Sequence, residues 1–145
     1  MNWLTSNKIV TGTNYADGSA DINCATVDMQ GYEGIVAIVH LAAIGGSGVN
    51  SIKWQQDTAS GMGTAADLLG TGITIADDDD NQIFATELFR PTERYVRLVI
   101  DKDASHNLAC SVHYILYGPE KLPVSNNVTD LVTSEIHASP AEGTA

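Results

Sequence analysis

The chain has 145 residues and carries 18 Asp and Glu against 7 Lys and Arg, which gives a formal net charge of -11 at pH 7. A chain of this length is expected to form one domain around one hydrophobic core. Because affinity for nucleic acid comes from basic side chains that displace counterions from phosphates, this charge balance argues against a nucleic-acid partner. No stretch approaches the roughly 18 apolar residues of a membrane helix, and the first residues lack the apolar run of a signal peptide. We therefore expect a protein made in a cytosol, with no membrane partner.

The N-terminal segment, residues 1–19, is polar and rich in turn-forming residues. It is expected to be an arm with at most one short edge strand around Ile9 and Val10. Trp3 in this arm is a candidate interface anchor, because the large apolar area of a tryptophan is wasted in water.

Apolar and polar residues alternate in short runs from Ala20 to Tyr117, which is typical of half-buried strands. Residues 35–43 are apolar on both faces except at His40, which predicts a central strand covered on both sides. No long amphipathic helix is expected, and Gly, Asp, Asn and Pro turns separate the runs. The expected strands are residues 20–25, 35–43, 51–57, 72–76, 82–89, 95–101 and 109–117. The sequence therefore predicts an all-β, antiparallel β-sandwich or jelly roll over residues 20–118.

The composition changes after Gly118. Residues 119–145 are rich in Ser, Thr, Asn and Ala, are interrupted by prolines and show no sustained alternation. This predicts an extended C-terminal tail and no second domain. Leu131 and Val132 give this tail apolar surface with which to lie on its own sandwich or on a neighbouring subunit.

The two cysteines, Cys24 and Cys110, lie far apart and lack the spacing of a metal site or a redox motif. Each is expected to be a small core residue, with neither a disulfide nor a nucleophilic role.

Four consecutive aspartates, Asp77, Asp78, Asp79 and Asp80, allow two interpretations. Their carboxylates suit Ca²⁺, although the ligand spacing and the glycine of an EF-hand are missing. Alternatively, they form a solvated hairpin turn whose charge discourages pairing at a sheet edge. The four histidines include no His-x-His pair of the cupin type, and no GxSxG motif marks a nucleophile. We therefore expect no catalytic residue, no cofactor and no enzymatic activity.

Arg90, Arg94 and Arg97 form the densest cationic cluster of this acidic chain. Arginines at a corner hold carboxylates through paired hydrogen bonds. The cluster is therefore either an anchor for another molecule or half of an internal ion pair, with Glu87 or Glu93 as the partner.

Four segments, in their order and spacing, resemble small proteins encoded beside the major capsid protein in tailed bacteriophages and prophages. These segments are residues 31–53, 76–81, 90–97 and 139–145. The resemblance covers the chain from about Asp21 to its C-terminal end.

The resemblance implies a capsid decoration, or cement, protein. Such a jelly roll binds the outside of the shell across capsomer junctions, often as a dimer or another small oligomer. The expected partner is the phage major capsid protein. The expected location is the capsid exterior of the virion, after synthesis in the bacterial cytoplasm. Contacts that tether two subunits at once gain avidity, so bridging neighbouring subunits would stabilise the head.

The candidate interface residues are the tryptophan of the arm, the three arginines and two apolar residues of the tail: Trp3, Arg90, Arg94, Arg97, Leu131 and Val132. Two other functions are consistent with the sequence, namely a carbohydrate-binding β-sandwich and a tail or fibre component exposed on the virion. Carbohydrate-binding modules usually present exposed aromatic residues in a row, whereas Trp54, Tyr95, Tyr114 and Tyr117 are scattered among the strands.

Overall fold

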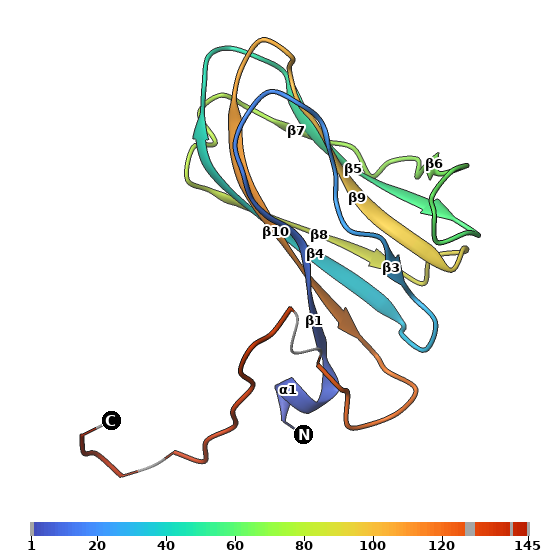
Figure 1. The fold of residues 1–145 in the computed structure, drawn as a ribbon, viewed down its shortest axis with the longest axis vertical. Coiled ribbons are helices and arrows are strands. Elements are labelled where there is room, and N and C mark those ends of the chain that lie inside the picture. The colour runs from blue at the N-terminus through green and yellow to red at the C-terminus, as the bar shows by residue number, and fades with distance from the viewer. Residues whose placement is uncertain (1, 127–129, 140, 145) are drawn as a thin grey trace.

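The computed structural model describes residues 2–126, 130–139 and 141–144, and it consists of two antiparallel sheets packed face to face (Figure 1). Sheet A is formed, in spatial order, by β1 (Lys8–Ala16), β10 (Leu108–Tyr117), β4 (Gly34–Ile44) and β8 (Ile83–Phe89). Sheet B is centred on β9 (Tyr95–Asp101) and β5 (Asn50–Asp57). The short strands β2 (Ile22–Asn23) and β3 (Val27–Asp28) pair with β9, and β6 (Ala66–Asp67) and β7 (Ile73–Ile75) pair with β5.

The strand order is that of a jelly roll. Counting β2–β3 and β6–β7 each as one interrupted strand, the eight resulting strands fall into two four-stranded sheets between which the chain passes back and forth. Strands distant in sequence thereby become neighbours, such as β1 and β10. The predicted all-β sandwich is confirmed.

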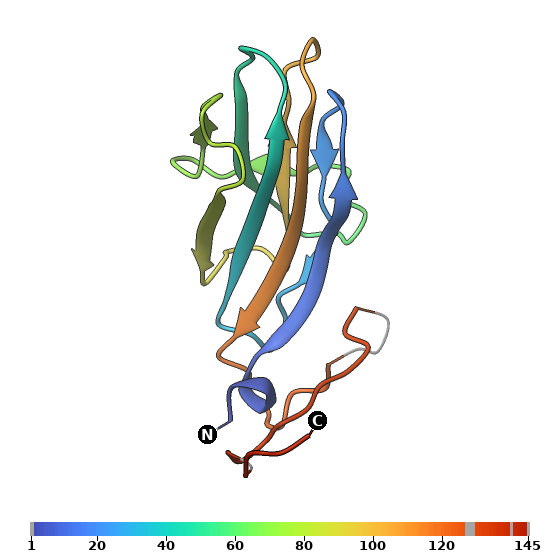
Figure 2. The same cartoon turned by 90° about the vertical axis from the view of Figure 1, so that its left-hand side faces the viewer.

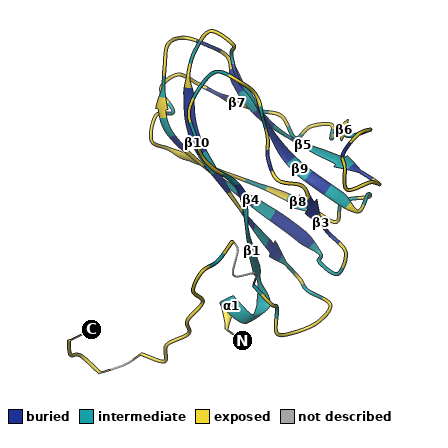
Figure 3. Cartoon of the chain, viewed as in Figure 1, coloured by how far each residue is buried: buried dark blue, intermediate teal, exposed yellow. Residues whose placement is uncertain are grey.

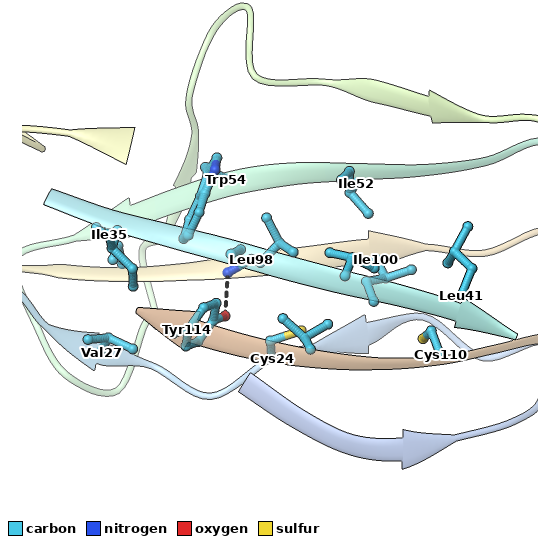
Figure 4. Close-up of a cluster of buried hydrophobic side chains, with 14 of the residues drawn as sticks. Cys24, Val27, Ile35, Leu41, Ile52, Trp54, Leu98, Ile100, Cys110 and Tyr114 are labelled. Atoms are coloured by element: carbon cyan, nitrogen blue, oxygen red, sulfur yellow. Dashed lines mark hydrogen bonds between the residues drawn. The ribbon is translucent and has the colours of Figure 1, made fainter. Parts of the chain in front are cut away.

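Side chains from the inner faces of both sheets form the core. Trp54 of sheet B stacks on Tyr114 of sheet A with 5.9 Å between ring centroids, and its indole Nε1 donates to Thr86 Oγ1 at 3.1 Å. The Leu98 N–H donates to the Tyr114 hydroxyl at 2.9 Å, across the interior (Figure 4). Polar groups are thus paired where the two sheets meet, as burial requires.

Both cysteines lie in this core as free thiols, as predicted. Burial raises the pKa of the Cys24 thiol to about 12. Neither thiol is therefore activated as a nucleophile.

The N-terminal segment contains a single helical turn, α1 (Trp3–Ser6), followed by β1. β1 is the edge strand that the sequence allowed around Ile9 and Val10, and it extends over nine residues because it pairs with β10. Gly12 in this strand lies so close to Val112 that an added Cβ would be only 2.7 Å from Val112 Cγ1.

The first part of the C-terminal tail is tied to the N-terminal segment. Asn126 Oδ1 accepts a hydrogen bond from the Ile9 N–H at 2.8 Å, and the Val124 N–H donates to the Thr5 carbonyl at 2.9 Å. From residue 130 onward the described tail extends past α1 and is largely exposed (Figures 1 and 3). Residues 127–129, 140 and 145 of the predicted tail lie outside the described residues.

One prediction about the central strand is wrong. β4 was expected to be covered on both sides, but sheet B covers only its inner face, where Ile35, Ala37 and Val39 are fully buried. The outward residues Val36 and Ile38 are only half-buried, by neighbouring side chains of their own sheet. Figure 2 shows this outer side of sheet A facing the viewer, with no further layer of the chain over it. A two-layer fold has no third layer for a second apolar face.

Candidate functional site

One end of the sandwich carries a concavity of about 470 Å³, which is the candidate binding site. Two neighbouring hollows of about 370 and 280 Å³ meet it at Tyr32. We call residues 28–33 and 90–94 the corner. The main concavity is lined by Met29, Gln30, Tyr32, Arg90, Pro91, Thr92, Glu93 and Arg94.

The two segments of the corner are hydrogen-bonded to each other through their backbones, because β3 pairs with β9 and β4 pairs with β8. The Met29 N–H donates to the Arg94 carbonyl at 2.8 Å, and the Arg90 N–H donates to the Glu33 carbonyl at 2.9 Å. Arg90 has a φ of 49°, a conformation that non-glycine residues rarely adopt. Such strained residues cluster at functional sites.

Each arginine of the corner is held by one carboxylate. Arg90 donates from Nε and Nη2 to Glu33 Oε1 at 3.1 and 2.5 Å. Arg94 forms a two-pronged pair with Asp28, at 2.9 Å from Nε to Oδ1 and 2.7 Å from Nη2 to Oδ2. The Arg94 guanidinium holds the pKa of the Asp28 carboxyl below its ordinary value. These pairs fix where each guanidinium points.

Both guanidiniums also lie over aromatic rings, at 4.9 Å from the centroid of Phe89 for Arg90 and 5.2 Å from that of Tyr95 for Arg94. Their side chains are nevertheless 70% and 49% exposed. Within the described residues, Nη1 of each arginine makes no hydrogen bond. The Nη1 groups of both arginines, each with two N–H donors, therefore remain available to a carboxylate brought by another molecule.

The half-buried Tyr32 lies where the three hollows meet, and burial raises the pKa of its phenol. It adds a neutral hydroxyl and an apolar ring to the two cations. The corner thus combines features of a protein-binding surface and contains no Cys, Ser or His nucleophile among its lining residues.

The structure divides the predicted arginine cluster. Arg90 and Arg94 line the same concavity, but Arg97 lies on the outer side of sheet B, where its Nε donates to Gln55 Oε1 at 2.9 Å. The expected internal partners, Glu87 and Glu93, are replaced by Glu33 and Asp28. This happens because the strand pairing brings residues 28–33, which are remote in sequence, beside residues 90–94.

Sequence reasoning missed Asp28, Tyr32 and Glu33 as parts of this site. The signal that could have found them is the turn around Gly31, where a tyrosine and an acid lie between two glycines. Gly31 has a φ of 85°, so the turn depends on a glycine.

The other candidate interface residues do not line the corner. Trp3 lies exposed on α1, Leu131 is half-buried on the tail, and Val132 is exposed there. They stay predictions for a second contact region.

The acidic run forms an exposed turn in which two carboxylates accept backbone hydrogen bonds. Asp79 Oδ2 accepts from the Ala76 N–H at 2.8 Å, and Asp80 Oδ1 accepts from the Ile44 N–H at 2.6 Å. In residues 2–126, 130–139 and 141–144, no group of three or more His, Cys, Asp or Glu side chains is arranged to hold a metal ion. Two of the four aspartates thus help to hold the turn.

Comparison with known proteins shows the fold and no family. No protein-family model and no curated protein matches the sequence. Among solved structures, the PBSX exported protein XepA superposes with a TM-score of 0.54 at 12% identity, over 96% of this chain and 45% of XepA. This chain therefore spans less than half the length of XepA. At such low identity the match supports a shared fold alone.

Two further solved structures are less similar. A Bacillus endospore appendage protein, from a family of disulfide-linked pili, has a TM-score of 0.46 at 15% identity, over 82% of this chain and 96% of that protein. PirA has a TM-score of 0.40 at 11% identity, over 74% of this chain and 94% of PirA. Among the described residues, no helix is long and apolar enough to cross a membrane.

Proposed function

We propose that this chain is a non-enzymatic structural protein of a tailed-phage virion. In this role it binds the outside of the capsid and stabilises the head by bridging neighbouring major capsid protein subunits. The resemblance of four sequence segments to proteins encoded beside major capsid proteins supports this function, and so does the jelly-roll fold.

The observation that carries the proposal is the pair of oriented, partly exposed guanidiniums at the corner. In a chain with a net charge of -11, most of the surface repels an acidic partner. Arg90 and Arg94 are pinned by Glu33 and Asp28 but keep their Nη1 donors open beside Tyr32. Donors fixed before binding lose little conformational freedom when they take a carboxylate of the shell.

The second contact in this proposal is the tail. Residues up to Asn126 are hydrogen-bonded to the N-terminal segment, whereas residues 131–144, as far as they are described, expose Val132 and Ile136. A tail anchored at one end and apolar further along suits a tether that reaches a neighbouring capsid subunit. Two weak contacts on one molecule then act together through effective concentration.

The test is co-sedimentation with expanded shells assembled from the major capsid protein encoded beside this chain. Arg94→Glu should weaken binding by at least about tenfold, since a desolvated charge contact at an interface is worth more than 1.4 kcal/mol. Arg97→Glu makes the same charge change outside the concavity and serves as the matched control. Removing residues 131–145 should also weaken binding and leave the melting temperature unchanged, because the hydrogen bonds of Asn126 remain.

Wild-type protein that does not sediment with saturating shells would refute the proposal. Equal losses for Arg94→Glu and Arg97→Glu would remove the corner from the contact and reduce it to internal architecture. Binding on a glycan array without binding to shells would favour the carbohydrate-binding alternative, for which Trp54 and Tyr114 are unsuited because both are fully buried.

A further inference from the structure

The free edge of β8 is a long strand edge that the described chain leaves open. β8 is the last strand of sheet A, and within the described residues it pairs with β4 alone. Its seven residues contain no proline and no lysine, and their pairing with β4 shows no register shift. Figure 2 shows β8 (olive, at the left) with no further strand of sheet A beyond it. Long, regular edges of this kind accept a strand from another chain.

The other sheet edges are closed or short. At β1, the Ile9 N–H donates to Asn126, the Gly12 carbonyl accepts from the Ala25 N–H at 2.7 Å, and two register shifts interrupt the pairing with β10. The edges of sheet B consist of β2 with β3 and of β6 with β7, none of which is longer than three residues. β8 is therefore the exception in a fold whose other edges are protected against pairing.

The hydrogen bonds at the two ends of β8 show which of its backbone groups face outward. The Arg90 N–H donates to the Glu33 carbonyl, and the Leu41 N–H donates to the Gln82 carbonyl, both at 2.9 Å. In an antiparallel pair, alternate residues exchange both bonds with the neighbouring strand, so the even-numbered residues face β4. The N–H and C=O groups along the free edge therefore belong to the odd-numbered residues: Ile83, Ala85, Glu87 and Phe89.

The turn between β6 and β7 favours one added strand over a second sandwich. The Trp54 carbonyl accepts from the Leu68 N–H at 2.9 Å and the Trp54 N–H donates to Thr71 Oγ1 at 3.1 Å, so residues 69–70 form a turn that projects from this edge of sheet B. Because the Trp54 indole also donates to Thr86, this turn lies near the middle of β8. Two sandwiches joined through β8 would bring both turns to the same place, whereas a single extended segment has no second sheet to collide with them.

The inner side of β8 is incompletely covered. Phe84 and Leu88 turn toward sheet B and pack on the core, yet both are only half-buried. Leu69 on the projecting turn is 101% exposed. A strand added to β8 would place alternate side chains beside Phe84 and Leu88 and near Leu69, which removes apolar area from water.

We propose that β8 accepts an extended segment of the major capsid protein as an additional strand of sheet A. This inference rests on the proposed function, because β8 leads directly into the corner. The Arg90 guanidinium, 70% exposed, lies 4.9 Å from the centroid of the Phe89 ring at the end of the strand. The segment thus has apolar or β-branched residues at alternate positions and an Asp or Glu at the end that lies beside Arg90.

Co-sedimentation of full-length variants with expanded shells tests the added strand. Ala85→Pro removes an outward N–H and leaves the bonds to β4 in place, so it should weaken binding by at least about tenfold. Thr11→Pro is the matched control. Its N–H also faces away from the sheet, by alternation with Ile9, but on β1. The control should bind within about twofold of the wild type.

A second pair of variants covers the case in which a proline lowers the melting temperature. Ala85→Lys leaves the backbone unchanged and places a charge on the edge, which discourages pairing, and Thr11→Lys is its control. Hydrogen exchange of the wild-type chain gives the location directly. Binding to shells should slow exchange of the outward β8 amides by at least about tenfold and leave the β1 amides unchanged.

Shell binding that the Ala85 and Thr11 variants retain equally, or β8 amides that gain no protection, would overturn the inference and leave the proposed function standing. A wild-type chain that does not bind shells would overturn both. If the chain alone forms a dimer at about 1 mM that Ala85→Lys abolishes, the occupant of the edge is a second copy and the capsid assignment is wrong.

Discussion

The outer sides of the two sheets differ sharply although the same chain builds both. On sheet B, the outward side chains form a connected polar network, in which Lys53 Nζ lies 2.9 Å from Asp67 and 3.0 Å from Asp101. Gln55 joins this network by donating to Asp67 at 2.7 Å and accepting from Arg97 at 2.9 Å. We call this surface face B. The outward side chains of β1, β10, β4 and β8, which we call face A, instead mix Ile, Val and Phe side chains with His40, His113 and Glu87.

This difference separates a side whose charged groups pair with one another from a side that leaves half-buried aliphatic side chains in contact with water. Face B satisfies its own charges, and exposed pairs of this kind contribute little to stability and nothing that requires a partner. Face A leaves apolar area in water, which a stable monomer gains nothing by keeping. Both outer sides can be probed by substitutions that leave the core intact.

The largest expected effect contrasts the two faces of β10. Tyr114 points inward, and its hydroxyl accepts a hydrogen bond from the Leu98 N–H. This N–H lies between the part of β9 that pairs with β2 and the part that pairs with β3, so neither short strand offers it a carbonyl. Tyr114→Phe leaves that buried N–H unpaired and should lower the free energy of unfolding by about 1–3 kcal/mol. Urea denaturation followed by fluorescence measures this loss.

Tyr117→Phe, on the outward side of the same strand, is the matched control and should cost less than about 1 kcal/mol at neutral pH. Burial, together with Glu87, raises the pKa of Tyr117 to about 12. The stabilisation of the fold by Tyr117 is therefore full below about pH 10 and declines as the pH rises toward 12. Tyr117→Phe should make the loss of unfolding free energy over this alkaline range smaller. Equal costs for the two substitutions at neutral pH would contradict the inward and outward assignment.

A smaller effect is expected at acid pH beside face B. Asp57, at the end of β5, accepts hydrogen bonds from the N–H groups of Ala59 and Thr64 at 3.0 and 2.8 Å. These bonds hold the pKa of its carboxyl below the ordinary 3.8. Its stabilisation is thus present above about pH 4 and is lost as the pH falls through the lowered pKa.

Asp57→Asn should therefore reduce the dependence of stability on pH between about pH 4 and pH 2, as measured by thermal unfolding in a pH series. Asp77→Asn, in the exposed acidic turn, removes the same charge and should leave the slope closer to that of the wild type. A steeper slope for Asp57→Asn than for the wild type would contradict this account of the Asp57 loop.

The sequence predicted the parts of the fold whose local pattern matches their environment. β5, β8, β9 and β10 lie within one residue of their expected bounds, because alternate side chains of each turn toward the core and period-two alternation records that arrangement. β1 was less visible, since its Thr, Asn and Gly residues form a strand only through pairing with β10. Its extent depends on tertiary contacts that no local pattern encodes.

The candidate site shows the same limit. Arg90 and Arg94 were identified from their local density, but their partners Glu33 and Asp28 lie 57 and 66 residues away in sequence. Only the pairing of β3 with β9 and of β4 with β8 brings them together. Arg97 was grouped with them because it is near in sequence. It lies beyond the corner, in β9, and the alternation of that strand turns its side chain to face B.

An electron cryomicroscopy map of expanded shells incubated with this chain tests the central claim most directly, that the sandwich works by binding other proteins through its surface. We predict density of jelly-roll size on the outside of the shell, with the corner turned toward the capsid. A shell without added density at saturating protein would contradict the proposed function. Added density in which the corner stays in solvent would contradict the proposed contact through Arg90 and Arg94.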